Sequence, residues 1–257
     1  MSVNNNKNHT PGSMENNKML IGSKLNFEGR EAYNLLRTNL MFATKRNDRN
    51  ARVIGITSSV HGEGKSLTVI NLAYSIAESG RKVILVECDL RLPTLRKKLN
   101  LPKATGLSSF LAGISSEKAT LHKDVLCPGF DFIPAGSIPP NPSELLGSKE
   151  FSKLIDNLAD AYDVVLLDLP PIGEVSDALV ASRCTDGLII VVRNDYTNAS
   201  DLDYAMRQCE LVKAKVVGFV YNCAASKAKR YKYGYGKKYK YGYGYGYAAQ
   251  SRKKKEA

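Results

Sequence analysis

The chain has 257 residues, of which 43% are hydrophobic, and its 37 Lys and Arg residues exceed its 25 Asp and Glu residues to give a formal net charge of +12. The excess lies at the end, because residues 226–257 hold eleven basic residues and one acidic residue, Glu256. The preceding 225 residues are nearly neutral and long enough for one α/β domain, so the charge does not mark the body of the chain as a nucleic-acid binder.

Three further classes are disfavoured. The longest apolar runs, 164–167 and 188–192, are far shorter than the roughly 20 residues that a membrane-spanning helix needs. The first residues lack the apolar centre of a secretory signal. The five cysteines are scattered, with no CxxC pair and no nearby His cluster, which argues against a zinc site. We therefore expect a cytoplasmic protein with reduced thiols.

The first elements predicted along the chain make a βαβ unit. Residues 1–25 are rich in Asn, Ser, Gly and Lys and predict a flexible leader. A helix is expected next, over 27–44, with an apolar face made of Ala32, Leu35, Leu36, Leu40 and Phe42. A strand over Val53–Thr57, a Gly-containing loop, a helix over 66–79 and a strand over 82–86 follow. This order predicts a parallel sheet.

Helices and strands continue to alternate through the rest of the body. Further helices are predicted near 107–111, 143–161, 176–183 and 199–212. Further strands are predicted at 130–134, 163–167, 187–193 and 216–222. We therefore expect a doubly wound α/β fold, with a mostly parallel sheet flanked by helices, over residues 26–224. Residues 225–257 form a low-complexity Tyr/Gly/Lys-rich tail, for which disorder is expected.

The segment SSVHGEGKS, residues 58–66, has the end of a P-loop and lies between a predicted strand and a predicted helix. Gly62 and Gly64 let the backbone turn its N–H groups toward phosphates, Lys65 supplies positive charge, and Ser66 offers a hydroxyl to Mg²⁺. The first Gly of the P-loop pattern is replaced by Ser59. The alternative is an ordinary Gly-rich turn before a helix that contains a lysine.

Carboxylates follow two of the predicted strands. Glu87 and Asp89 stand two residues apart, so they share a face if the strand continues through both. Asp168 ends a hydrophobic strand, as a Walker B acid does when it holds magnesium. Ligands of open α/β sheets bind beyond the carboxyl ends of strands. Two solvated acids in a loop, and a chance strand-end Asp, are the alternatives.

The order of these motifs resembles the bacterial protein-tyrosine kinases of capsular and extracellular polysaccharide synthesis, of the type without membrane segments of its own. The resemblance covers about Leu25 to Ala224 and the Tyr-rich end. It rests on EAYNLLRTNL, ITSSVHGEGKS, ECDLRLPTL, GLSSFLAG, AGSIPPNPSELL, YDVVLLDLPP and DGLIIVVR. The related deviant-Walker ATPases that position chromosomes and division sites carry a second lysine early in the P-loop. No lysine lies between Val53 and Gly64 here, which favours the kinase branch.

The resemblance implies a P-loop NTPase fold, ATP and Mg²⁺ as cofactors, and a role for each motif residue. The catalytic residues would be Lys65, Glu87, Asp89 and Asp168. The magnesium ligands would be Ser66, Asp89 and Asp168. The nucleotide would be bound by Gly62, Glu63, Gly64, Lys65, Ser66, Leu67 and Asn222.

Four of the side chains concerned carry alternatives or departures from the family. Glu87 would accept the tyrosine proton, although the family usually has Asp there. His61 replaces a common Pro, and an exposed side chain is favoured over a phosphate contact. Arg91 either binds phosphate or forms a structural ion pair. Asn222 either reads adenine or caps its strand.

Eight tyrosines alternate with Gly and Lys in the tail. The resemblance makes them phosphoacceptors, namely Tyr231, Tyr233, Tyr235, Tyr239, Tyr241, Tyr243, Tyr245 and Tyr247. A segment that stacks on single-stranded nucleic acid and a basic anchor on anionic lipid are the alternatives. Each phosphate adds about −1.5 to −2 charge, so full modification would reverse the charge of the tail.

The resemblance also implies partners and a location. In the family an E-x-x-R-x-x-R motif on the first helix helps to close a ring of subunits; here Glu31 and Arg37 are present, and Asn34 replaces the middle Arg. We expect a homo-oligomer, a transmembrane adaptor that activates the kinase at the inner face of the cell membrane, and a cognate phosphotyrosine phosphatase. No nucleic-acid partner is expected. The alternative function is that of a non-kinase positioning or partition ATPase whose basic tail binds DNA or lipid.

Overall fold

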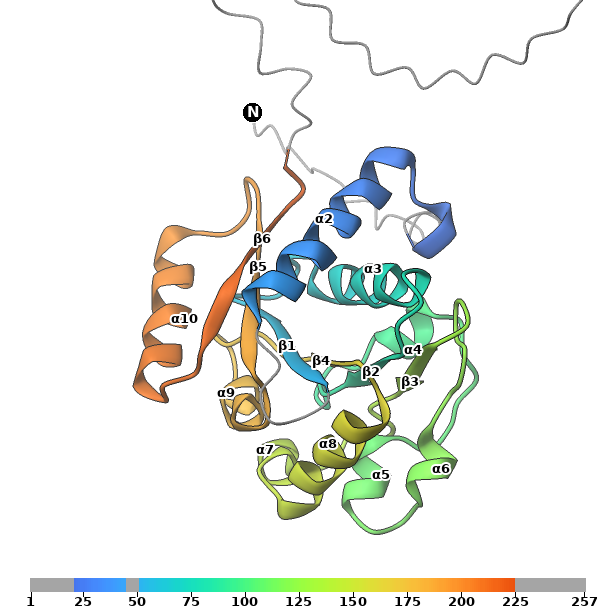
Figure 1. The fold of residues 1–257 in the computed structure, drawn as a ribbon. Coiled ribbons are helices and arrows are strands. Elements are labelled where there is room, and N and C mark those ends of the chain that lie inside the picture. The colour runs from blue at the N-terminus through green and yellow to red at the C-terminus, as the bar shows by residue number, and fades with distance from the viewer. Residues whose placement is uncertain (1–20, 45–50, 225–257) are drawn as a thin grey trace, which may run out of the picture. The chain divides into compact units, whose positions relative to one another are not determined.

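The computed structural model describes residues 21–44 and 51–224, which include one six-stranded sheet (Figure 1). Every pairing of neighbouring strands in this sheet is parallel, and the strand order is β3-β2-β4-β1-β5-β6. The strands are β1 (Arg52–Ser58), β2 (Val83–Glu87), β3 (Phe130–Ile133), β4 (Val164–Asp168), β5 (Gly187–Arg193) and β6 (Val216–Asn222).

Helices cover both faces of the sheet, as Figure 1 shows. On one face lie α2 (Phe27–Ala43), α3 (Lys65–Glu78) and α4 (Leu95–Lys98). On the other lie α5 (Leu107–Leu111), α7 (Pro142–Leu146), α8 (Lys149–Ala161), α9 (Asp177–Ala181) and α10 (Ala199–Leu211). The short elements η1 (Gly22–Lys24), α6 (Glu117–Thr120) and η2 (Ser182–Cys184) complete the described chain.

Alternate strand residues fill two separate cores, because successive side chains of a strand point to opposite faces. In β2, Val83 and Leu85 pack under α3, while Ile84 and Val86 pack against the layer that contains α8. All five residues of β2 are buried, as are all five of β4. Such continuous apolar strands are expected in a parallel sheet that is covered on both sides.

The strand order places a binding edge next to β1. From β1 the chain moves along the sheet to β2 and β3, and it then returns through β4 and continues on the other side of β1 as β5 and β6. In open α/β sheets, ligands bind beyond the carboxyl ends of the strands at such a reversal. The loops after β1, β2 and β4 are therefore where a site is expected, and these loops carry the sequence motifs.

The predicted α/β architecture is confirmed, and the predicted boundaries differ mainly in one helix. The segment 143–161 forms two helices, α7 and α8, separated at Gly147 and Ser148. The hydroxyl of Ser148 accepts a hydrogen bond from the Phe151 N–H at 3.1 Å and so starts a new helix. Apolar residues occur on both sides of Gly147 and Ser148. The sequence pattern therefore predicts one continuous helix.

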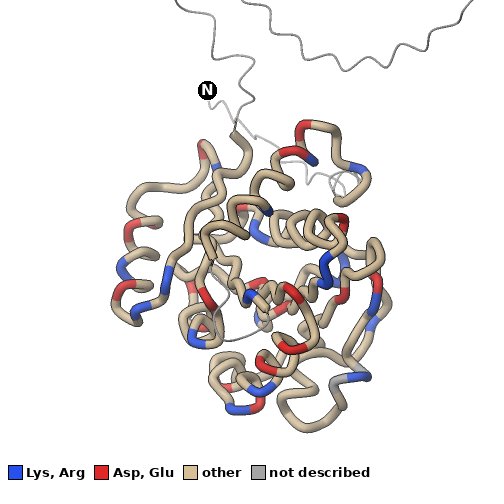
Figure 2. Tube along the Cα trace, viewed as in Figure 1, with Lys and Arg blue, Asp and Glu red and all other residues tan. Residues whose placement is uncertain are grey.

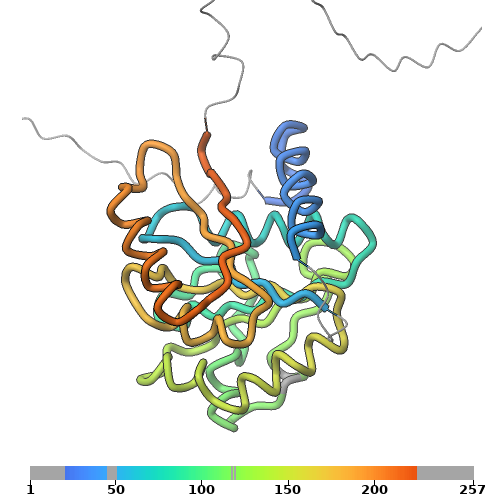
Figure 3. Tube along the Cα trace, turned by 60° about the vertical axis from the view of Figure 1, so that its left-hand side comes forward, coloured from blue at the N-terminus to red at the C-terminus, as the bar shows by residue number. Residues whose placement is uncertain are grey.

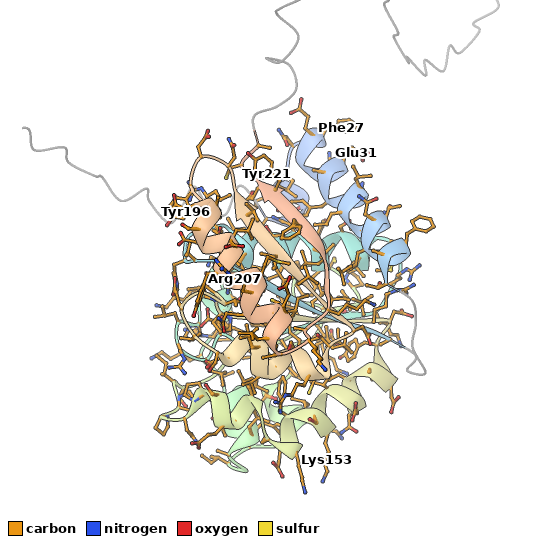
Figure 4. All side chains as sticks on the ribbon, turned by 90° about the vertical axis from the view of Figure 1, so that its left-hand side faces the viewer. Phe27, Glu31, Lys153, Tyr196, Arg207 and Tyr221 are labelled. Atoms are coloured by element: carbon orange, nitrogen blue, oxygen red, sulfur yellow. The ribbon has the colours of Figure 1, made fainter. Side chains whose placement is uncertain are left out.

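The first helix is confirmed as α2, but its predicted apolar face is partly wrong. Leu40 is buried, whereas 61% of Leu35 and 84% of Phe42 are exposed. The helix contacts the core through Leu40 together with the half-buried Tyr33 and Leu36. Phe27 and Glu31 lie toward its first end, as Figure 4 shows. Figure 3 shows the same helix, in blue, near β6, which is the strand at one edge of the sheet.

Residues 21–25, the end of the predicted leader, contact the body of the protein. Ile21 is buried, and the Gly22 N–H donates to the Asn71 side chain at 2.9 Å.

Within the described ranges, no helix combines the length and the apolar character that a membrane crossing requires. Acidic and basic residues are interspersed over the described elements (Figure 2). The rest of the leader and the tyrosines predicted as phosphoacceptors lie outside the described residues.

Candidate active site

The loop between β1 and α3 has the backbone that the P-loop motif predicts. Gly62 and Gly64 both have a positive φ, 82° and 91°, which L side chains rarely adopt. The buried Glu63 between them accepts a hydrogen bond from the Val60 N–H at 3.0 Å and another from the Thr197 hydroxyl. The carboxylate of Glu63 thus holds the loop in shape, and α3 begins at Lys65 with its free N–H groups at the loop.

Gly64→Ala is expected to weaken nucleotide binding at least about tenfold, because the added Cβ would lie 2.0 Å from Asn222 Nδ2 as well as at a φ of 91°. Titration with a fluorescent ATP analogue measures this loss. Gly80→Ala is the matched control, since Gly80 has a φ of 80° and a Cβ added there would meet no neighbouring segment within 4 Å. Equal losses of affinity in the two variants would contradict the prediction.

Lys65 lies between two buried carboxylates at the base of the loop. Its Nζ donates to Asp168 Oδ1 at 3.1 Å and to Asp89 Oδ2 at 3.3 Å. The exposed fractions of Lys65, Asp89 and Asp168 are 8%, 5% and 1%. Burial opposes the charge on Lys65, but attraction to Asp168 and Asp89 outweighs it and raises the pKa of the ammonium. Lys65 is therefore a protonated, fixed cation.

The two acids of this cluster come from neighbouring strands. Asp168 is the last residue of β4, and burial raises its pKa against the opposing charge of Lys65. Asp89 follows β2, and the Cys88 N–H donates to the Asp168 carbonyl at 2.9 Å, which extends the contact between the two strand ends. Asp89 Oδ1 accepts from the Leu92 N–H at 3.1 Å. The predicted Lys65, Asp89 and Asp168 are thus brought together.

Glu87 is not part of this cluster, which corrects the expectation that it faces the site beside Asp89. β2 ends at Glu87, and the Leu90 N–H donates to the Cys88 carbonyl in a tight turn, so the alternation stops before Asp89. Glu87 is buried, and its Oε1 and Oε2 accept from the N–H groups of Leu95 at 2.6 Å and Ala135 at 3.0 Å. Burial raises the pKa of this carboxyl. Each oxygen thus accepts a backbone N–H, and Glu87 is not among the residues that line the pocket described next.

A pocket of about 450 Å³ opens over the loop, a size typical of small-molecule sites. It is lined by Ser58, His61, Gly62, Glu63, Gly64, Lys65, Ser66, Leu67, Asp89, Leu92, Thr94, Lys98, Pro171, Arg193, Asn222 and Cys223. The predicted nucleotide-binding residues all belong to this lining. Asn222 ends β6 and donates from Nδ2 to the Glu63 carbonyl at 2.9 Å, so it fixes the loop as well as lining the pocket.

Several residues at the rim were not predicted from the sequence. Arg193 ends β5, donates to the Gly62 carbonyl at 2.9 Å, and stacks with its guanidinium carbon 4.9 Å from the ring centre of Tyr196. Figure 4 labels the exposed Tyr196. A basic residue at the end of a predicted strand was the available signal for Arg193. Thr94 precedes α4 and Lys98 ends it. This helix has only four residues, too few for a helical periodicity to be recognised in the sequence.

Arg91 takes the structural alternative. It forms a two-pronged ion pair with Asp177, from Nε at 2.8 Å and from Nη2 at 3.0 Å. Asp177 begins α9, is fully buried, and also accepts from the hydroxyl of Ser143 in α7. One carboxylate thus joins the loop after β2, α7 and α9. Arg91 is not among the residues that line the pocket.

His61 lies at the exposed edge of the pocket. Its Nδ1 is 2.9 Å from Glu174 Oε2, and its backbone N–H donates to the other oxygen of the same carboxylate at 2.7 Å. The exposed side chain that the sequence favoured is therefore observed, and the contact partner is a carboxylate.

Of the two α2 residues predicted at a subunit interface, Glu31 contacts Asn34 within α2, and Arg37 contacts α3. Asn34 Nδ2 donates to Glu31 Oε1 at 3.0 Å, and Arg37 Nη1 donates to Ser75 Oγ at 3.1 Å. The Ser75 hydroxyl in turn donates to Asn34 Oδ1 at 3.0 Å. Arg37 therefore helps to attach α2 to α3 within the chain, and Glu31 lies exposed at the surface.

The site's components fit a magnesium nucleotide. The glycine-turned loop leads into a helix N-terminus, and the pocket above it contains a buried lysine, the hydroxyl of Ser66 and the carboxylate of Asp89. Backbone N–H groups and lysine bind phosphate, while hydroxyl and carboxylate oxygens suit Mg²⁺. The arrangement is therefore suited to phosphoryl transfer or nucleotide hydrolysis.

Comparisons with known proteins separate these two activities. A family model described as an AAA domain matches residues 51–217. The tyrosine-protein kinase YwqD of Bacillus subtilis is 37% identical over 198 residues, which are 75% of this chain and 80% of that protein. The tyrosine-protein kinase CpsD of Streptococcus agalactiae serotype Ia is 33% identical over 205 residues, 78% of this chain and 85% of that protein.

Solved structures agree. The chimerical protein CapA2B2 has a TM-score of 0.73 at 32% identity and matches 80% of this chain and 89% of its own. The kinase domain of the Escherichia coli tyrosine kinase ETK has a TM-score of 0.71 at 32% identity, with 80% of each chain covered. The septum site-determining protein MinD of Pyrococcus horikoshii shares the fold, with a TM-score of 0.56 at 24% identity. The chain belongs to the bacterial tyrosine-protein kinase family and is an enzyme of that class.

Proposed function

We propose that this kinase transfers the terminal phosphate of Mg-ATP to its own C-terminal tyrosines, mainly from one subunit of an oligomer to the tail of another. By this it would regulate the polymerisation or export of capsular or extracellular polysaccharide. The buried cluster of Lys65, Asp89 and Asp168 at the base of the P-loop carries the proposal, because it places a fixed cation and two carboxylates at the phosphate end of a nucleotide pocket.

The motif residues of the site then have defined tasks. The N–H groups from Gly62 to Leu67 would bind phosphate oxygens, Lys65 would neutralise their charge, and Asn222 would read the adenine. Mg²⁺ would be held by Ser66, Asp89 and Asp168, and it would supply charge neutralisation on the phosphates. Because the transition state of such transfers is loose, neutralisation and alignment contribute more than a strong base does.

The tail is proposed as both substrate and switch. Residues 26–224 would form the kinase domain, and the acceptors would be the eight tyrosines between 231 and 247. Full phosphorylation adds about −12 to −16 charge, more than the excess of ten positive charges in residues 226–257. A tail that attracts acidic surfaces before modification would repel them afterwards, which gives autophosphorylation a physical means of regulation.

The proposed partners follow the family resemblance. A transmembrane adaptor would recruit the kinase from the cytoplasm to the inner face of the cell membrane, and a phosphotyrosine phosphatase would reset the tail. Oligomerisation would bring each tail to a neighbouring pocket, with Glu31 exposed on α2 as one contact. Arg37 is hydrogen-bonded to Ser75 of α3 within the same chain. It would therefore also hold α2 in the position from which Glu31 contacts the neighbouring subunit.

Incubation of the full chain with Mg-ATP and the adaptor's cytoplasmic segment tests the proposal. Mass spectrometry of residues 231–247 is expected to find several phosphotyrosines in the wild type and none above background in Lys65→Met. Mixing Lys65→Met, as acceptor, with a wild-type chain of different mass is expected to label the variant's tail, since transfer occurs between subunits. A wild-type tail without phosphotyrosine would refute autophosphorylation, and labelling confined to the active chain would refute transfer between subunits.

A further inference from the structure

A second lysine, Lys98, lines the nucleotide pocket together with Lys65, Ser66 and Asp89. It is the last residue of α4, the short helix that follows the loop after β2. Lys98 is half-buried, and its Nζ donates to the hydroxyl of Thr94 at 2.6 Å. Within residues 21–44 and 51–224, no carboxylate forms an ion pair with it. This ammonium group therefore has a neutral partner that a phosphate oxygen would replace favourably.

The surroundings of Lys98 are those of the reaction centre. Burial lowers its pKa, and Lys65 lowers it further, while Asp168, Glu87 and Asp89 act in the opposite direction. Lys98 thus lies within electrostatic reach of the cation and both carboxylates of the proposed phosphate and metal site. A partly desolvated ammonium in this position interacts more strongly with an anion than a surface lysine does.

The position of Lys98 is fixed by Glu87. The helix α4 has four residues and would not hold its shape alone. Its first N–H, from Leu95, is bonded to Glu87 Oε1, while Oε2 is bonded to Ala135 beyond β3. Leu95 itself is fully buried in the core on the α3 face of the sheet. Glu87 therefore joins α4 to two strand ends and positions the lysine at its last turn.

The charges of the pocket indicate that a bound triphosphate would require a further positive group. Lys65 is shared between Asp89 and Asp168, so the three side chains together are negative before any nucleotide binds. A triphosphate adds more negative charge than one divalent cation neutralises. Arg193, at the rim, is engaged with the Gly62 carbonyl and the Tyr196 ring. Of these three cations, Lys98 is the one whose side-chain contact is a hydroxyl.

We propose that Lys98 contacts the terminal phosphate of ATP and stabilises it during transfer, with Glu87 as its positioning residue. This inference rests on the Mg-ATP chemistry proposed above. In that step the bond from the terminal phosphorus to the ADP oxygen breaks, the bond to the tyrosine oxygen forms, and the tyrosine proton passes to water. Lys98 remains protonated throughout and exchanges its bond to Thr94 for one to phosphate.

Calorimetric titration of the full chain with ADP and with a non-hydrolysable ATP analogue, both with Mg²⁺, tests the contact. Lys98→Met is expected to weaken binding of the ATP analogue about tenfold and binding of ADP less than about twofold, since ADP lacks the phosphate concerned. The kcat for tail phosphorylation is expected to fall about tenfold or more. Lys98→Arg is expected to restore most of the preference for the triphosphate, because it restores the charge.

Lys97→Met is the matched control, because Lys97 is the exposed neighbour on the same helix and is absent from the pocket lining. It is expected to leave both affinities unchanged. Equal losses for ATP analogue and ADP, or no loss for either, would overturn the role of Lys98 while leaving the nucleotide site intact. A wild-type chain that binds neither ligand would overturn both proposals. If Lys98→Met unfolds, Lys98→Gln provides the same comparison with a polar side chain.

Discussion

Lys65→Met is expected to slow tail phosphorylation about 10²- to 10³-fold, a loss typical for removal of one preorganised charge from a reaction centre. The change leaves Asp89 and Asp168 facing one another without the cation that now bridges them at 3.3 and 3.1 Å. Lys65 now opposes the rise that burial causes in the pKa of Asp168, so that pKa is expected to rise further in the variant. Initial rates of phosphotyrosine formation measure the effect.

A matched control separates the charge lost at the site from charge lost anywhere. Lys153→Met removes an exposed lysine from α8, on the opposite face of the sheet from α3, at the position that Figure 4 labels. It is expected to retain the wild-type rate. The assignment of Lys65 fails if Lys65→Met keeps more than about a tenth of that rate while its thermal unfolding remains cooperative.

Glu87→Gln is expected to destabilise the protein by about 1–3 kcal/mol, because one of two buried backbone N–H groups loses its carboxylate acceptor. An amide keeps one oxygen but presents an N–H₂ group to the second donor. Because Glu87 also holds α4 in place, the substitution is expected to displace Lys98 and to lower the rate of phosphate transfer as well. Denaturant unfolding between pH 5 and pH 8 measures the loss, and Glu210→Gln, an exposed change in α10, is the control.

The difference in stability between wild type and Glu87→Gln is expected to narrow as the pH rises. Burial raises the pKa of Glu87 above its ordinary 4.5, so the folded protein holds a proton that the unfolded chain has already lost. The unfolding free energy of the wild type therefore falls as the pH increases from 4.5 through the raised value. The variant lacks this contribution of Glu87. A rate loss without any loss of stability would instead favour Glu87 as the proton acceptor.

The sequence was sufficient where local pattern determines structure. The strands β5 and β6 match their predicted ranges because apolar runs with clear ends occur at both. The P-loop, Asp89 and Asp168 were found because short motifs after strands converge at one edge of a parallel sheet. The order of helices and strands then gave the doubly wound architecture.

Contacts between segments that are distant in the chain could not be predicted from local sequence patterns. The bond from Ala135 to Glu87 spans 48 positions in the chain, and nothing local to Glu87 indicates that a backbone donor occupies its carboxylate. The helix α4 is too short for any periodicity, so Lys98 had no predicted place in the pocket. The exposure of Leu35 on α2 likewise depends on which face α3 covers, which the helix's own spacing leaves open.

The carboxylate of Asp177 also has a consequence for motion. It binds Arg91 of the loop after β2 and Ser143 of α7, while belonging to α9 itself, and all three bonds meet in a fully buried group. Separating any one of these segments would leave a buried charge without its partners, which is costly in a low-dielectric interior. The segments should therefore open together, as one cooperative unit in amide hydrogen exchange, and protect their backbone amides to a similar degree. The loop after β2, α7 and α9 would then move as a single body, whereas the contact of His61 with Glu174 at the edge of the P-loop is exposed to solvent.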